Sequence, residues 1–101
     1  MLKGFQKKYL RGLAHGLEAL VIVGQKGLTD SLLRSVNEEL DIHELIKIRF
    51  NDFKEKDQKN EIMTKISSET GSEMAGMIGH TAILYRQHSD PEKRKISLPK
   101  K

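Results

Sequence analysis

Apolar side chains near the N-terminus recur at the spacing of one helix face. They lie one to four positions apart, at Phe5, Tyr9, Leu10, Leu13, Ala14 and Leu17. This period predicts an amphipathic helix over residues 4–16, with Gly16 as its C-cap. The apolar run at residues 19–23 then predicts a strand. Because its apolar residues are continuous and do not alternate with polar ones, we expect a central strand that is covered on both faces.

The middle of the chain predicts a second helix and a second strand. A helix is expected from about residue 29 to residue 40, with Thr29 as its N-cap. Residues 44–50 alternate, which predicts a strand with Ile46 and Ile48 on its core face. A loop that begins at Gly24 joins the first strand to this helix.

The second half of the chain predicts one more helix and a hairpin. The strongly charged residues 51–60 lead into a helix that Gly71 ends. Residues 74–77 and 81–86 are expected to form two strands that a tight turn at Gly79 joins.

Two strand-helix-strand crossovers followed by a hairpin give a mixed sheet. The predicted fold class is α/β (α+β), a two-layer sandwich of a four-stranded mixed sheet and three helices in the order α-β-α-β-α-β-β. We expect residues 1–88 to form this single domain. Residues 89–101 lose the apolar period and are expected to form a basic C-terminal tail with Lys93, Arg94 and Lys95.

The composition indicates the class of protein and the cellular compartment that suits it. The 101 residues are 37% hydrophobic and 32% charged, a balance that suits one globular domain. The absence of cysteine excludes a disulfide framework and fits a reducing compartment. The longest apolar run is far too short to span a membrane. We therefore expect a soluble, cytoplasmic monomer without a membrane partner.

Positive charge is concentrated at the two ends of the chain. The net charge is +4 overall, and it divides into +4 for residues 1–27, −4 for residues 28–75 and +4 for residues 76–101. A polyanion is a natural partner for such a distribution, although a slightly basic surface that serves solubility alone is an equal alternative on charge alone.

The loop Gly24-Gln25-Lys26-Gly27 is the main candidate for a binding site. Glycines allow positive φ and close approach of the backbone, while Gln25 and Lys26 project outward. With Thr29 as its cap, the next helix would point its free N–H groups toward the same loop, which suits a phosphate. The alternative is that the glycines serve turn geometry only.

The first predicted helix carries a basic edge. Lys7 and Arg11 lie four residues apart with Lys8 beside them, and no acidic residue precedes Glu18. A solvated helix face is the usual explanation of such a stripe, but a helix that needs only solubility more often mixes the two signs.

The sequence contains no motif of an enzyme or a metal site. The four histidines lie in different predicted elements, without the spacing of metal ligands or a nucleophile motif. Gly27 is followed by Leu28, so the loop lacks the Gly-Lys-Ser/Thr ending of a nucleotide-hydrolysing loop. We expect no catalytic residue, no metal, no cofactor and no small-molecule substrate.

Short motifs in these elements resemble one known family. They are Tyr9-Leu10-Arg11, Leu13-Ala14-His15, Val23-Gly24, Gly27-Leu28-Thr29, His43-Glu44-Leu45-Ile46-Lys47, Glu69-Thr70-Gly71, Ile78-Gly79, Leu84-Tyr85-Arg86 and Ile96-Ser97-Leu98-Pro99. In their order and spacing they are similar to the stand-alone bacterial YhbY proteins, the minimal form of the chloroplast RNA splicing and ribosome maturation (CRM) domain.

The resemblance implies a fold similar to the C-terminal domain of bacterial translation initiation factor three. It also implies binding to ribosomal RNA in precursors of the large subunit, with the loop from Gly24 to Gly27 similar to the Gly-x-x-Gly clamp of KH domains. Two positions depart from the family's pattern: Ala19 stands where relatives commonly have proline, and the loop interior is Gln-Lys where asparagine is frequent at the second position.

The expected RNA-binding residues are therefore the loop and the two basic segments: Gly24, Gln25, Lys26, Gly27, Lys7, Lys8, Arg11, Lys93, Arg94 and Lys95. A Gly27→Glu change is expected to weaken RNA binding and to leave the fold intact. The alternative function is a protein-interaction module whose basic ends dock on an acidic surface of an assembly factor or ribosomal protein.

Overall fold

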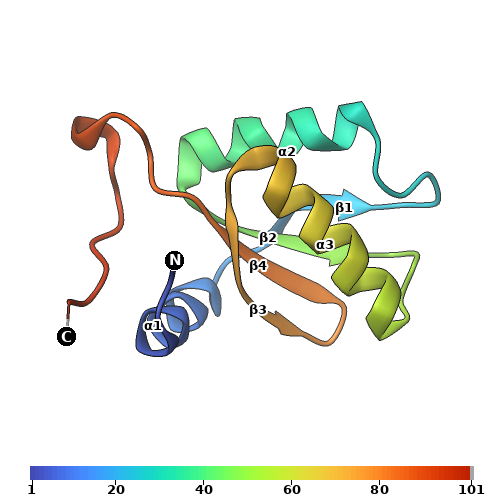
Figure 1. Ribbon diagram of the computed structural model, residues 1–101, viewed down its shortest axis with the longest axis horizontal. Coiled ribbons are helices and arrows are strands. Elements are labelled where there is room, and N and C mark those ends of the chain that lie inside the picture. Colours follow the sequence, from blue (N-terminus) through green and yellow to red (C-terminus); the bar gives the residue numbers. More distant parts are fainter. Residues whose placement is uncertain (101) are drawn as a thin grey trace.

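A computed structural model describes residues 1–100 (Figure 1); Lys101, the last residue of the predicted tail, lies outside the described residues. Residues 1–100 form three helices and four strands in the predicted order. They are α1 (Gly4–Ala14), β1 (Ala19–Val23), α2 (Asp30–His43), β2 (Leu45–Phe50), α3 (Lys56–Thr70), β3 (Glu73–Ile78) and β4 (Thr81–Tyr85), followed by a single 3-10 turn at Pro91–Lys93.

The four strands form one mixed sheet in the order β1-β2-β4-β3. β1 is parallel to β2, whereas β4 is antiparallel to both β2 and β3. The predicted mixed sheet and its element order are therefore confirmed.

Helices cover both faces of the sheet. α2 and α3 enclose the larger core, in which Val36, Ile66 and Phe50 are buried. α1 covers the opposite face with Leu10 and Ala14. The expectation of two layers is wrong in this respect, because α1 adds a third layer (Figure 1).

β1 is an edge strand, so its prediction as a central strand is wrong. Val21 and Val23 point into the core beneath α2 and α3, but Leu20 is 49% exposed and Ile22 is 44% exposed. α1 packs mainly on β2, β3 and β4 and leaves these two side chains of β1 exposed. The uninterrupted apolar run therefore reflects one buried face and one open apolar face.

Helix ends differ from the prediction where the chain supplies an unexpected cap. α1 stops at Ala14, and His15, not Gly16, is its C-cap. α2 continues to His43, past the expected end near Leu40, because Glu44 takes a positive φ of 63° and its N–H bonds to the carbonyl of Leu40. Among residues 1–100, no helix combines the length and the apolar character that a membrane crossing requires.

Candidate nucleic-acid interface

The predicted glycine loop is a tight turn at one end of the molecule. It leaves β1 after Val23 and closes through a hydrogen bond from the N–H of Gly27 to the carbonyl of Gly24, at 3.0 Å. Gln25 and Lys26 are exposed at its tip. Figure 1 shows that this loop extends beyond the sheet, which leaves it accessible to a large partner.

The two glycines of the loop have different roles. Gly27 is buried and has a φ of 63°, and a Cβ there would lie 3.1 Å from Cε2 of Phe53. Gly24 is not in the left-handed region, and nothing lies within 4 Å of the position of a Cβ. The fold therefore requires glycine at position 27 but not at position 24. The expectation that Gly27→Glu leaves the fold intact does not fit this geometry.

The N-terminus of α2 lies directly after the loop. Oγ1 of Thr29 accepts a hydrogen bond from the N–H of Leu32 at 3.0 Å, which confirms the predicted N-cap. The exposed Asp30 occupies the first turn, where its carboxylate already complements the positive end of the helix dipole. The dipole of α2 is therefore partly compensated from within the chain, and loop amides and Lys26 offer the better contacts for an anion.

A groove runs from the loop between α2 and the outer edge of β1. Its volume is about 610 Å³, and residues that line it include Leu20, Ile22, Gly24, Lys26, Thr29 and Ser35. Among the described residues that line the groove, Lys26 alone is charged. Because β1 pairs with β2 alone, the groove also offers the backbone groups of an open strand edge. It therefore combines polar backbone, apolar side chains and one cation.

The basic residues of α1 lie on the other face of the sheet. Lys8 is exposed and Lys7 is half-buried. Arg11 packs against β3: its Nη1 donates to the carbonyl of Ala75 at 3.0 Å, and a Cβ at Gly76 would lie 2.6 Å from its Cδ. Arg11 is thus part of the packing of α1 on the sheet as well as a cation.

The described part of the basic tail lies beside α1. Nε2 of Gln6 donates to the carbonyl of Pro99 at 3.2 Å, and Ile96 and Leu98 pack against the core beneath α1. Nε of Arg94 donates to the carbonyl of His88 at 2.8 Å. Lys93 and Lys95 are exposed next to it.

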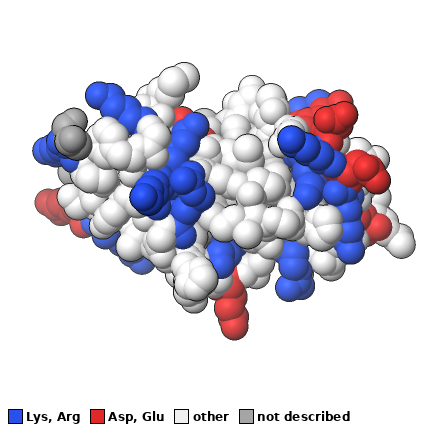
Figure 2. Space-filling view, turned by 90° about the horizontal axis from the view of Figure 1, so that it is seen from below, with Lys and Arg blue, Asp and Glu red and all other residues white. Residues whose placement is uncertain are grey.

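The predicted site residues therefore fall into two groups. The loop stands at one end of a molecule 38 Å long, and α1 with the tail occupies the other end. On the face that carries α1, Figure 2 shows Lys and Arg side chains mainly toward the left and the right of the view, with acidic side chains beside those on the right. The structure brings α1 and the tail together but not the loop.

Glu44 holds the tail in place, which the sequence pattern did not reveal. The side chain is 1% exposed and accepts three backbone N–H bonds, from His88 at 2.7 Å, Lys95 at 2.7 Å and Ile96 at 3.0 Å. Three charge-assisted bonds satisfy a buried carboxylate that would otherwise be costly. A glutamate directly before a strand gives no signal of this role.

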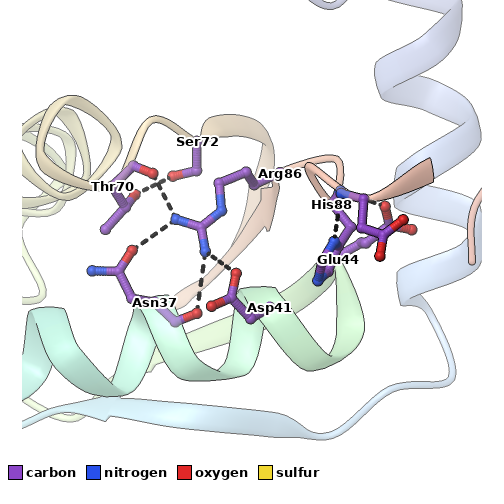
Figure 3. Close-up of polar contacts among 8 residues, drawn as sticks. Asn37, Asp41, Glu44, Thr70, Ser72, Arg86 and His88 are labelled. Atoms are coloured by element: carbon purple, nitrogen blue, oxygen red, sulfur yellow. Dashed lines mark hydrogen bonds and ion pairs between the residues drawn. The ribbon is translucent and has the colours of Figure 1, made fainter. Parts of the chain in front are cut away.

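Arg86 joins the ends of three elements (Figure 3). Its guanidinium donates to Oδ1 of Asn37 and to the carbonyl of Thr70, both at 2.7 Å, and to Oδ1 of Asp41 at 2.9 Å. Its side chain is 21% exposed. The planar fork thus links α2, the end of α3 and the end of β4, opposite the glycine loop.

Tyr85 has a buried hydroxyl beneath the tail. Within residues 1–100 its Oη has no hydrogen-bond partner. Burial raises the pKa of this hydroxyl above its usual value, the negative charge of Glu44 raises it further, and the positive charge of Arg94 opposes the shift.

The histidines do not converge in the part of the chain that the structure describes. His43 pairs with Glu39 at 3.4 Å, and Nδ1 of His80 lies 3.2 Å from Nζ of Lys59. Across residues 1–100, no group of three or more His, Asp or Glu side chains has the arrangement of a metal site.

Comparisons with known proteins point to one family. Residues 2–86 match the family model of the CRS1 / YhbY (CRM) domain. A protein of Haemophilus influenzae named RNA-binding protein is 38% identical over 95% of this chain and 93% of its own length. The probable RNA-binding protein YqeI of Bacillus subtilis is 34% identical over 98% of this chain and its full length.

The fold also matches a solved structure. The solution structure of SAV1595 from Staphylococcus aureus, described as a hypothetical protein and candidate RNA binder, superimposes with a TM-score of 0.81. The match covers 98% of this chain and all of the other, at 31% identity.

Proposed function

The chain belongs to the CRS1/YhbY (CRM) domain family, and on that premise we propose that it is a non-catalytic RNA-binding protein centred on the loop from Gly24 to Gly27. The names of its relatives support RNA as the ligand. The proposal that the loop binds RNA rests on Gly24, where neither backbone strain nor packing inside the chain requires glycine. A residue without Cβ at this open position lets an outside backbone approach closely.

The loop acts on RNA through its backbone. The amides of Gln25 and Lys26 donate to phosphate oxygens, since the amide of Gly27 already bonds to the carbonyl of Gly24. Lys26 adds a positive charge, and the groove along β1 accepts the adjoining nucleotides. Such contacts position the RNA more than they read its sequence. The few aromatic residues, 5% of the chain, favour this mode over base stacking.

The second basic group extends the footprint. Lys7, Lys8 and Arg11 on α1 and the tail cations Lys93, Arg94 and Lys95 contact RNA beyond the loop, because the molecule is 38 Å long and the loop stands at its other end. The RNA proposed is ribosomal RNA in precursors of the large subunit, bound by a cytoplasmic monomer. The division into residues 1–88 and the tail 89–101 stays a prediction.

Binding of a fluorescent RNA, measured by anisotropy as a function of salt, tests the loop. Gly24→Glu places a negative charge beside the proposed phosphate and should lower affinity about tenfold or more, with native circular dichroism. The matched control is Ser68→Glu on the exposed face of α3, which adds the same charge away from the loop. Equal affinities of the two folded variants would contradict the proposal.

A pulldown from cell extract tests the proposed ribosomal target. Nuclease treatment should release the protein from large-subunit precursors if RNA holds it. Retention after digestion would instead support the alternative, a protein partner on an acidic surface.

A further inference from the structure

A second cavity lies on the open part of the sheet, on the face that carries α1. It has a volume of about 370 Å³, and the residues that line it include Arg11, His15, Lys47, Arg49, Ile78 and Thr81. None of the described residues that line it is a carboxylate. The cavity therefore favours an anion.

Two of these cations are held in place by the fold. Nζ of Lys47 donates to the carbonyl of Leu17 at 2.9 Å, just past the end of α1, and Arg11 donates to the carbonyl of Ala75. Both partners are neutral carbonyl groups, so the two positive charges are not cancelled. Arg49 differs, because it is exposed and its side chain makes no hydrogen bond or ion pair within residues 1–100.

The cavity adjoins the groove at the glycine loop. Ile22 pairs with Arg49 across the β1–β2 ladder, and Ile22 also lines the groove. Gly24 follows Ile22 by two residues, one position past the end of β1. One interstrand spacing and two residues of extended chain place the Cα atoms of Gly24 and Arg49 about 8 Å apart. The edge of β1 is therefore a shared rim between the two hollows.

We propose that the RNA strand held at the glycine loop crosses the edge of β1 and continues onto the open sheet, where Arg49 binds one of its next phosphates. This rests on the proposed function of the loop. Ile22 lies beside Arg49 on β1, and Ile78 lies beyond Thr81 in the same cross-strand row. They are 44% and 63% exposed and provide apolar contact for ribose and base faces. The continuity with the groove favours RNA over an acidic protein as the occupant.

A titration of the ¹⁵N-labelled full chain with the oligonucleotide U10 follows both hollows at once. The amide signals of Lys26 and Gly27 should shift together with those of Arg49 and Thr81. Shifts at the loop without shifts at Arg49 and Thr81 would overturn this inference and leave the loop intact as the RNA site. No shift at either place would overturn both.

Two variants separate a continuous strand from an independent anion site. Gly24→Glu should remove the shifts at Thr81 as well as those at the loop, because the same strand makes both contacts. Arg49→Gln should remove the shifts at Thr81, keep those at the loop and weaken U10 about tenfold. Persistence of the Thr81 shifts in Gly24→Glu would overturn the continuity.

The control for the loss of charge is Lys65→Gln on α3, across the sheet from Arg49. Lys65 is 60% exposed and pairs with Glu61 at 3.8 Å. The hollow that it lines also reaches Gly27, but the carboxylates of Asp57 and Glu61 make it unfavourable for RNA. The affinity of the Lys65→Gln variant for U10 should stay within about twofold of the affinity of the unmodified chain. A loss equal to that of Arg49→Gln would reduce the role of Arg49 to net charge and overturn the proposal.

Discussion

The carboxylate of Glu44 accepts a hydrogen bond from the backbone N–H of Lys95 at 2.7 Å, which joins two residues 51 positions apart. The same side chain binds the N–H groups of His88 and Ile96. Its position depends on a backbone φ of 63° at the junction of α2 and β2. The end of one helix thus fixes the path of the tail along the sheet.

Glu44→Gln should loosen the tail. The amide oxygen can accept fewer bonds than a carboxylate, and its NH₂ group would face N–H donors, so we expect a loss of about 1–3 kcal/mol in the free energy of unfolding. Urea denaturation measures the loss, and hydrogen exchange locates it at the amides of Lys95 and Ile96. Unchanged protection of these two amides would contradict the role of Glu44.

Arg86→Lys should also destabilise the protein, although it conserves the charge. An ammonium cannot reproduce the fork that reaches Asn37, Thr70 and Asp41, so a loss of about 1–3 kcal/mol is expected in urea denaturation. Asp41→Asn is the control, because its side chain is 68% exposed and an exposed pair contributes less than about 1 kcal/mol. Equal losses in the two variants would contradict this ranking.

Local patterns in the sequence were sufficient for the elements and their order. The N-cap at Thr29, the helix end at Gly71 with a φ of 68° and the turn at Gly79 depend on neighbouring residues only, and the structure has each of them. The edge position of β1 could not be predicted in this way. It depends on which strands pair with β2, since β4 takes the other side of β2 and leaves β1 at the edge. The apolar run at residues 19–23 looks the same for a covered strand and for one with an open face.

The roles within the candidate site depend on contacts between distant residues. Gly24 and Gly27 are equivalent in the motif, and the structure distinguishes them by the positive φ of Gly27 and by the ring of Phe53 beside it. The buried bonds of Glu44 and the pairing of Ile22 with Arg49 are likewise tertiary. The sequence therefore identified the loop, but it could not assign the role of each residue.

Gly27→Ala should lower stability, whereas Gly24→Ala should weaken RNA binding. Alanine at position 27 meets both the positive φ and the ring of Phe53, so we expect a loss of about 1–2 kcal/mol in stability. Alanine at position 24 should leave stability within about 0.5 kcal/mol and weaken RNA binding, because the Cβ stands where the RNA backbone approaches. Thermal denaturation and anisotropy measure the two effects. Loss of stability in Gly24→Ala would contradict the assignment.

Tyr85→Phe should stabilise the protein. The buried hydroxyl lacks a partner in the described part of the chain, so its removal should add about 1 kcal/mol to the free energy of unfolding at pH 8. Because the pKa of Tyr85 is higher in the folded state, the phenol ionises more readily in the unfolded chain. The unmodified protein therefore keeps its full stability below the unfolded pKa of about 10 and loses stability as the pH rises above it. The advantage of phenylalanine should therefore grow in urea denaturation at pH 10.5. A less stable variant at pH 8 would show that the hydroxyl is satisfied.

Lys26→Gln should change the salt dependence of RNA binding, because each phosphate that a cation neutralises releases counterions. The slope of log K against log salt should become less negative by about 0.7 for a single-stranded RNA.

With a short oligonucleotide that fills only the groove, Arg94→Gln should leave the slope unchanged, since Arg94 stands beside α1 at the other end of the molecule. With a structured ribosomal RNA fragment, both variants should reduce the slope. Anisotropy titrations at several salt concentrations measure these slopes. Equal effects of both variants on the short oligonucleotide would mean that the cations act through net charge and not at two separate contacts.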